Sequence, residues 1–194
     1  VPDWYIGSCK KIKYMFPKAH AAAYVLSAIR VAWWKLYYPQ EYYSVYFTTR
    51  CDAYEIETMV KGKEAVFSRR KEIEQLKIEK RSAKKDEDLF GVFDICLEMF
   101  ERGYRFSNID LELSDATRFM PHPNDQKIIV PPFSCIDGLG EAVAISVVEA
   151  RKEHSFISKE DVMKRTRLNN THIKTLTLMN VFEDLQEENQ LSLF

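Results

Sequence analysis

Apolar residues recur at helical spacing along most of the chain. From Pro17 to about Leu36 nearly every position is apolar, and Pro17 suits the first turn of a helix, where its missing N–H costs nothing. A helix that is apolar on almost every face is normally buried in a larger body. The aromatic positions 33/37 and 42/43/46/47 also follow a helical period, which favours core packing over base stacking.

The middle of the chain alternates between short helices and charged segments. Asp52 is expected to cap a short helix that ends near Gly62, and the sparse apolar positions after it predict an exposed helix with intrahelical ion pairs. The charge-rich residues 77–88 are predicted to fray into a mobile loop, since a charge run is usually a solvated surface. An amphipathic helix is then expected from Leu89 to Arg102.

A small β region is predicted next. Residues 109–113 alternate with period two, and residues 117–120 and 127–130 flank a Pro-His-Pro-Asn-Asp turn. The fold class is therefore mainly α with a small β region.

The segment from Phe133 to Ala142 predicts a short helix, a Gly-Leu-Gly hairpin and a second helix. Gly138 and Gly140 can adopt positive φ and carry no Cβ that would keep a ligand away, while Leu139 is expected to anchor the turn in the core. The backbone of Gly138 to Glu141 and Ala142 would then face an anion at the positive end of the second helix. Such a device grips a DNA phosphate without reading a base. The alternative is a plain helix–helix turn in which glycine only ends a helix.

Charge near this hairpin is unfavourable for DNA, because Asp137 and Glu141 lie within it. The compensating positive charge is expected from residues 158–175, which include Lys164 and Arg165. In that region Ser158-x-x-Asp161 resembles a capping box, and Asn170 or Thr171 is expected to cap a last helix ending near Met179.

Composition narrows the classes of protein. With 194 residues, 46% of them hydrophobic, the chain can bury a core, and a net charge of −1 excludes a simple polybasic nucleic-acid binder. The four cysteines form no Cys-x-x-Cys pair and the four histidines show no metal-ligand spacing. No signal peptide or membrane-length apolar run is evident, and the chain begins at Val1 without Met. We therefore expect the end of a longer cytoplasmic protein.

Residues 13–24, KYMFPKAHAAAY, look like a signature of the C-family bacterial replicative polymerases. They are similar to the PolC-type DNA polymerase III alpha subunits, and Met15-Phe16-Pro17 favours that type over the DnaE type. The resemblance implies that this element belongs to the polymerase fingers, beside the incoming dNTP. It implies that Lys18 and His20 contact the triphosphate of the incoming nucleotide, with Lys13 and Arg30 as secondary candidates.

The last five residues, Gln190-Leu191-Ser192-Leu193-Phe194, match the pentapeptide with which bacterial replication proteins bind the sliding clamp, the beta subunit. Gln190 would make a polar contact, and Leu191, Leu193 and Phe194 would enter an apolar pocket. Exposed apolar side chains on a flexible tail are typical of a docking peptide. A frayed tail without a partner is the alternative.

The resemblance also implies a domain organisation. Residues 1–106 would be the C-terminal part of the fingers, 107–132 a small β connector, 133–182 a helix-hairpin-helix DNA-binding unit, and 183–194 a linker with the clamp peptide. The partners would be primer-template DNA, the incoming dNTP, the sliding clamp and the rest of the polymerase, in the cytoplasmic replisome and not at a membrane.

No catalytic residue is expected in this chain. Polymerases hold two Mg²⁺ ions with paired carboxylates. The pairs Asp86/Asp88 and Asp110/Glu112 are unsuitable, because the first is expected in a charged loop and the second on the wet face of an edge strand. The resemblance implies that Mg²⁺ binds upstream, in the parent polymerase, and that the chain alone is inactive.

Two other functions remain compatible with parts of the sequence. A stand-alone adaptor that links DNA to the clamp would need only the hairpin and the tail. A helix-hairpin-helix DNA repair enzyme, such as a nuclease, would use the same two elements. Neither requires the element at residues 13–24, which therefore favours a polymerase.

Overall fold

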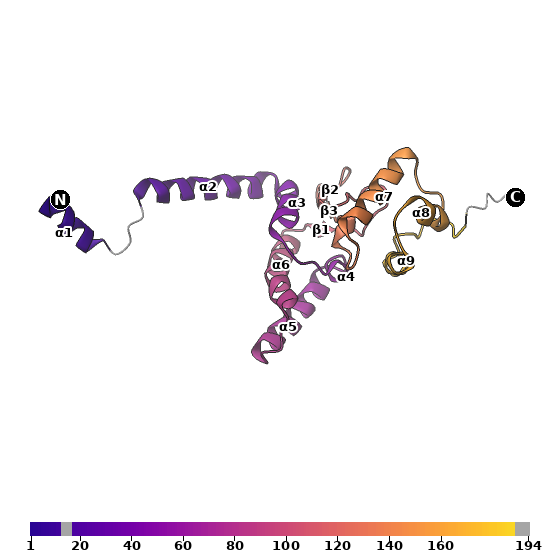
Figure 1. The fold of residues 1–194 in the computed structure, drawn as a ribbon, viewed down its shortest axis with the longest axis horizontal. Helices are drawn as coiled ribbons and strands as arrows, with labels where there is room; N and C mark the ends of the chain where they lie inside the picture. Colours follow the sequence, from indigo (N-terminus) through magenta and orange to yellow (C-terminus); the bar gives the residue numbers. More distant parts are fainter. Residues whose placement is uncertain (13–16, 189–194) are drawn as a thin grey trace. The chain divides into compact units, whose positions relative to one another are not determined.

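The structure, a computed structural model, describes residues 1–12 and 17–188 (Figure 1). The chain divides into two compact units, Val1–Pro39 and Gln40–Phe194. The fold is mainly α with a small three-stranded sheet, as predicted from the sequence.

The first unit contains two helices, α1 (Asp3–Lys11) and α2 (Lys18–Tyr37). The sequence pattern predicts α2 correctly, whereas α1 was not predicted. No residue of either helix is buried. The prediction that Trp33 and Tyr37 pack in a core is wrong for these two residues. Their rings contact each other along α2, with centroids 5.2 Å apart, and both stay exposed.

The core of the second unit begins in α3 (Pro39–Arg50). Tyr43 and Phe47 are fully buried, which confirms the prediction of core packing for the second aromatic set. The Phe47 ring lies 5.1 Å from that of Phe106 and 5.5 Å from that of Phe119, so α3 packs against the β region.

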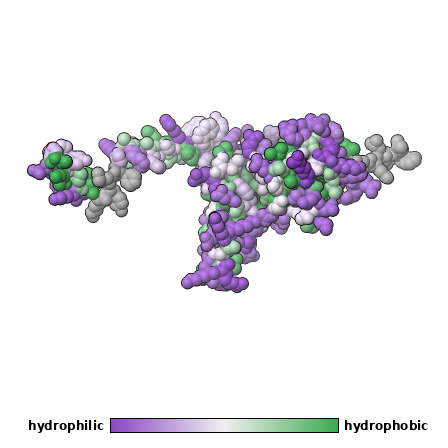
Figure 2. Space-filling model, in the orientation of Figure 1, coloured by the Kyte–Doolittle hydropathy of each residue, from purple (hydrophilic) through white to green (hydrophobic). Residues whose placement is uncertain are grey.

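Three helices follow: α4 (Ile56–Met59), α5 (Lys63–Ile78) and α6 (Lys84–Glu101). Helices α5 and α6 lie side by side, and their projecting ends carry hydrophilic side chains (Figures 1 and 2). The prediction that Asp52 caps a helix is wrong, because α4 begins only at Ile56, with Glu55 at its N-cap.

The predicted loop at residues 77–88 is also mostly wrong. Helix α6 begins at Lys84, because the Asp86 carboxylate accepts the Ala83 N–H at 3.0 Å and satisfies the start of the helix. Asp86 also pairs with Arg69 of α5 at 3.1 Å. Only residues 79–83 connect the two helices.

The sheet consists of β1 (Arg105–Phe106), β2 (Met120–Pro121) and β3 (Ile128–Val130), in the order β1-β3-β2. Strand β3 pairs in parallel with β1 and antiparallel with β2. The predicted strand at residues 109–113 is wrong. The Asp110 carboxylate accepts the N–H groups of Glu112 and Leu113, at 2.7 and 2.8 Å, and this bends the segment into a turn.

The remaining helices are the 3₁₀-helix η1 (Phe133–Cys135), α7 (Glu141–Glu153), α8 (Lys159–Arg165) and α9 (Asn170–Leu178). The Ser158 hydroxyl accepts the Asp161 N–H at 3.0 Å, which confirms the predicted cap of α8. The cap of α9 is Asn169 rather than Asn170 or Thr171.

The segment after α9 returns to α8. The backbone N–H of Lys159 donates to the Gln186 carbonyl at 2.9 Å, and that of Glu160 donates to the Glu187 carbonyl at 3.2 Å. Lys159 and Glu187 also form an ion pair. The segment expected to be a linker is therefore held through Glu187. Within the described ranges, no helix combines the length and apolar character needed to cross a lipid bilayer.

Candidate nucleic-acid interface

The hairpin connects η1 to α7 within the second unit. The Leu139 N–H donates to the Ile136 carbonyl at 3.0 Å, which closes a tight reversal of the chain. Leu139 is only 3% exposed, whereas Gly138 and Gly140 on either side of it are exposed. The buried leucine thus holds two exposed glycines at the surface, as the sequence predicts.

Glycine stands at positions 138 and 140 for different physical reasons. Gly138 has φ +79°, a conformation that L side chains rarely adopt, so the backbone itself requires glycine there. Gly140 has φ −71° and ψ 159°, which any residue adopts. A Cβ built on Gly140 would meet nothing within 4 Å. Neither the backbone nor the packing of this chain therefore requires glycine at position 140.

Gly140 is also the N-cap of α7. Its carbonyl accepts the N–H groups of Val143 and Ala144, at 3.0 and 3.1 Å. The N–H groups of Glu141 and Ala142 have no acceptor within the described residues, and both residues are exposed. Free N–H groups at the positive end of a 13-residue helix attract an anion. Without a side chain at position 140, an anion can approach them closely.

His172 of α9 holds the hairpin through a hydrogen bond to its backbone. Its Nε2 donates to the Gly138 carbonyl at 3.1 Å, in the tautomer in which Nδ1 accepts the Asn169 N–H at 3.2 Å. His172 is buried, so this brace is shielded from water. The hairpin is therefore held rigidly before any ligand arrives.

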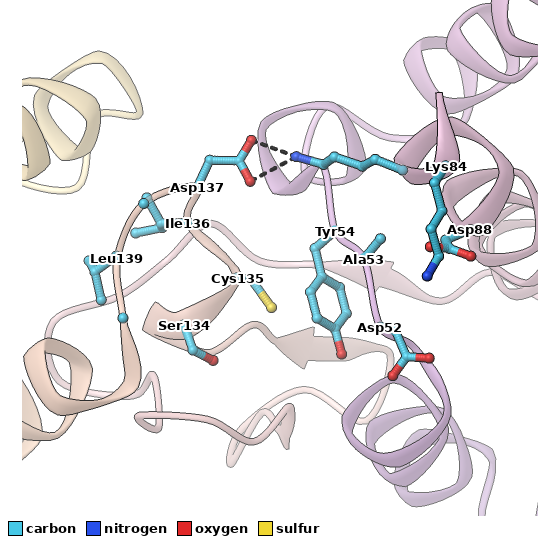
Figure 3. Close-up of a pocket in the computed structure, with 13 residues that line it drawn as sticks. Asp52, Ala53, Tyr54, Lys84, Asp88, Ser134, Cys135, Ile136, Asp137 and Leu139 are labelled. Atoms are coloured by element: carbon cyan, nitrogen blue, oxygen red, sulfur yellow. Dashed lines mark hydrogen bonds and ion pairs between the residues drawn. The ribbon is translucent and has the colours of Figure 1, made fainter. Parts of the chain in front are cut away.

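An open cleft of about 750 Å³ lies beside the hairpin (Figure 3). Residues 134–140 form one side of it, and residues 52–54 of the loop after α3 and the start of α6 form the rest. Burial raises the pKa of the Cys135 thiol in this wall, so Cys135 is a neutral thiol at pH 7. The charged residues lining the cleft are Asp52, Lys84, Lys85, Asp88 and Asp137.

The two basic DNA-binding candidates in α8 differ in how exposed their side chains are. Lys164 is exposed and pairs with Glu160, one turn earlier on the same helix. The Arg165 guanidinium is largely buried, pairs with Asp161 at 3.0 Å, and donates to the carbonyls of Ala150 and His154. Arg165 thus joins α8 to the end of α7, and its role as a DNA contact stays a prediction.

In the first unit, Lys18 and His20 lie together in the first turn of α2, where both are exposed, and the His20 ring contacts that of Tyr24. Arg30 lies on the same helix, and twelve residues at 1.5 Å per residue place it about 18 Å from Lys18 along the axis. The structure therefore does not bring Arg30 to the site formed by Lys18 and His20. Lys13 and the pentapeptide Gln190–Phe194 lie outside the described residues.

One carboxylate of each pair considered from the sequence has structural partners. Asp86 is held by Arg69 and the Ala83 N–H, and Asp110 by the backbone of its own turn. Among the described residues, no group of three or more histidine, cysteine or acidic side chains is arranged to hold a metal ion.

Sequence reasoning missed several residues around the hairpin. His172 lies three residues after Asn169, and this spacing is a capping signal in the sequence. Lys84 and Lys85 were assigned to a solvated loop. Their approach to the hairpin depends on contacts across about 50 residues of sequence, which a local pattern does not show.

The two glycines, the buried leucine and the helix that follows form a helix-hairpin-helix motif, and the family model described as "Helix-hairpin-helix motif" matches residues 103–191. The whole chain is 47% identical to the DNA polymerase III PolC-type of Halalkalibacterium halodurans, 46% to that of Bacillus subtilis and 47% to that of Streptococcus mutans. Each alignment covers 100% of this chain and 13% of the relative. The chain therefore corresponds to a segment of the PolC-type DNA polymerase III family, which confirms the resemblance seen in the sequence.

Proposed function

We propose that this chain is the duplex-holding part of a PolC-type polymerase, in which the hairpin binds a DNA phosphate through backbone N–H groups. The observation that carries the proposal is Gly140. It is a glycine that neither the backbone nor the packing requires, placed directly in front of two free N–H groups. A DNA phosphate that approaches these N–H groups closely would explain why glycine stands at this position.

The surroundings of the hairpin suit such a contact. Arg151 near the end of α7 donates to the carbonyls of Leu111 and Ser114, at 2.9 and 2.6 Å, so both ends of α7 are fixed. A fixed helix keeps its N–H groups aimed at one phosphate and loses little entropy on binding. Because only phosphate oxygens are contacted, binding should not depend on the base sequence.

Replacement of Gly140 by valine tests this proposal. The side chain would stand in front of the Glu141 and Ala142 N–H groups, and we expect duplex affinity to fall about tenfold or more at every sequence tested. The melting temperature should fall only slightly, since φ is ordinary and the space is open, although valine is a poorer N-cap than glycine. Gly91→Val is a matched control, because Gly91 is an exposed glycine of α6 whose Cβ would also meet nothing. An unchanged affinity in Gly140→Val would leave the hairpin as a plain turn.

The finer assignments extend this proposal to the parent enzyme. Lys18 and His20, with Lys13 and Arg30 as secondary candidates, would contact the triphosphate of the incoming dNTP. The exposed first turn of α2, where Lys18 and His20 lie together, supports the first two. Lys18→Ala in the intact polymerase should raise the KM for dNTP. An unchanged KM in a steady-state primer-extension assay would remove this assignment.

The pentapeptide Gln190–Phe194 would tether the polymerase to the sliding clamp. Tethering raises the local concentration of enzyme at the primer without strengthening any DNA contact. Deletion of the five residues should abolish clamp capture in a pull-down and leave duplex affinity unchanged. Retained clamp capture would exclude the pentapeptide as the docking element.

The proposed reaction of the parent is template-directed extension of primer-template DNA by nucleotidyl transfer in the cytoplasmic replisome. Two Mg²⁺ ions would be held by carboxylates of the parent outside this chain. Duplex binding by this chain without primer extension, in Mg²⁺ and all four dNTPs, is the expected result. Extension by the pure chain would place the catalytic carboxylates within it.

A further inference from the structure

One side of the cleft beside the hairpin is closed by an ion pair that spans 52 residues of sequence. The Nζ of Lys85, at the start of α6, lies 2.9 and 2.8 Å from the two carboxylate oxygens of Asp137 (dashed lines in Figure 3). Asp137 directly precedes Gly138. The ammonium group of Lys85 is thus held beside the hairpin at which we propose that phosphate binds.

This ion pair is exposed, with about half of the Lys85 side chain and most of the Asp137 side chain in water. Exposed pairs between flexible side chains contribute little to stability. The pair therefore has a small structural role, and exchange of Asp137 for another anion would cost the fold little. A phosphate offers oxygens with a spacing and charge similar to those of the carboxylate.

The other charges of the cleft are unevenly placed. Lys84, next to Lys85, has no ion-pair partner within the described residues and lines the same cleft. Asp52 and Asp88 lie on the side of the cleft away from Leu139 (Figure 3). Of the three acidic residues, only Asp137 belongs to the hairpin, so it is the one that a phosphate at the hairpin would meet.

We propose that Lys85 is a latent phosphate ligand, and that a DNA phosphate takes the place of Asp137 on it when the hairpin engages a duplex. Lys84 adds a second positive charge in the same cleft. This inference rests on the proposed function, because it assumes that duplex DNA reaches the hairpin. It supplies the positive charge that the hairpin itself lacks, and it makes Asp137 an internal competitor that weakens binding.

The test is that removal of the two charges of one ion pair should change duplex affinity in opposite directions. Lys85→Ala should weaken duplex affinity about five- to tenfold at 0.1 M salt and reduce the slope of log K against log salt by about one contact. Asp137→Asn should strengthen affinity about threefold, since it frees Lys85 and removes a negative charge next to the phosphate. Lys84→Ala should weaken binding less than Lys85→Ala does.

Lys63→Ala is the matched control. Lys63 starts α5 as Lys85 starts α6, and it forms a similarly exposed ion pair with Glu101 at 2.7 Å. Its affinity for duplex should equal that of the unchanged chain. Melting temperatures of all variants should agree closely, because both ion pairs are exposed.

The outcomes separate this inference from the proposed function. If Gly140→Val weakens binding but Lys85→Ala and Asp137→Asn leave it unchanged, the hairpin binds DNA and the latent-ligand inference is wrong. A purely structural ion pair would make Lys85→Ala and Asp137→Asn change affinity in the same direction, which also overturns it. If Gly140→Val has no effect, the proposed function fails first.

Discussion

Two turns of the second unit are built around a buried leucine, but they differ in whether the N-terminus of the following helix is capped by a side chain. The turn Gly138-Leu139-Gly140 precedes α7, and the turn Arg167-Leu168-Asn169 precedes α9. In both, a central leucine is buried, with 3% and 6% of its surface exposed, and the next helix starts directly after the turn. The buried leucine therefore fixes where each turn lies.

The residue after the leucine decides whether the helix start is available. Asn169 covers the start of α9, because its side-chain oxygen accepts the His172 N–H at 2.9 Å. Gly140 has no side chain and leaves the start of α7 uncovered. A helix that receives its cap from within gains stability, whereas a helix without one keeps N–H groups for a ligand.

The two turns also support each other. The capped turn contributes His172, which donates to the Gly138 carbonyl, and α7 contributes Ser146, whose hydroxyl oxygen accepts the Arg167 N–H at 2.9 Å. The second turn, whose helix is capped, thus helps to position the first turn, whose helix is not capped by a side chain. We therefore expect substitutions around the second turn to act mainly on stability, and those at the open face of the first turn to act mainly on binding.

The largest effect is expected for Arg165→Ala, just before the second turn. Asp161 would remain buried without its partner, and two carbonyls would lose a donor. We expect a loss of about 3 kcal/mol in the free energy of unfolding. Urea denaturation of the variant measures this loss. A variant of full stability with a reduced salt dependence of DNA binding would instead show that Arg165 acts mainly as a DNA contact.

Gly138→Ala should act on the first turn through the backbone. Alanine at φ +79° costs about 1–2 kcal/mol of folding stability. Duplex affinity of the folded fraction should fall less than in Gly140→Val, which separates the conformational glycine from the one that admits a ligand. Thermal unfolding and duplex titration of both variants give the comparison, and equal stability losses would contradict it.

Asn169→Ala removes the cap of the second turn. The expected loss of stability is about 1 kcal/mol, typical of a missing N-cap side chain. Asn169→Gly should cost less, because glycine is a tolerated N-cap. If Asn169→Ala instead reduced duplex affinity without any loss of stability, the second turn would itself be a binding site.

The smallest effect is expected for Arg167→Ala, the one second-turn substitution that should act on binding rather than on stability, because its side chain lines a cleft shared with Ala142. The Arg167 side chain is exposed and faces a cleft of about 690 Å³ that is also lined by Ala142 of the first turn. A single exposed cation near the phosphate should contribute about threefold to duplex affinity, and the loss should disappear at high salt. Titration at two salt concentrations measures it, and an effect that persists in high salt would point to another cause.

Local rules predicted the parts of this fold that local chemistry determines. Ser158 at the start of α8, the apolar run of α2 and the buried Leu139 each follow from a few neighbouring residues. Local chemistry also explains why the strand predicted at residues 109–113 is wrong. The sequence alternates there, but the Asp110 carboxylate binds the backbone N–H groups that follow it and folds the segment into a turn.

The rest depends on contacts between distant residues. The start of α6 depends on Asp86, whose partner Arg69 belongs to α5. His172 reaches Gly138 across 34 residues, and Lys85 reaches Asp137 across 52. A single sequence gives the chemical character of such residues but not their neighbours. The hairpin was therefore predictable as a motif, while the residues that hold it and add charge to it were not.

The segment after α9 packs back onto α8. The Glu187 carbonyl accepts the Glu160 N–H at 3.2 Å, and the Gln186 carbonyl accepts the Lys159 N–H at 2.9 Å. The Gln186 and Glu187 carbonyls and the Glu187 carboxylate each bind α8, so the chain is fixed against the start of this helix as far as Glu187. Loss of these contacts would release this segment from α8 without touching the hairpin.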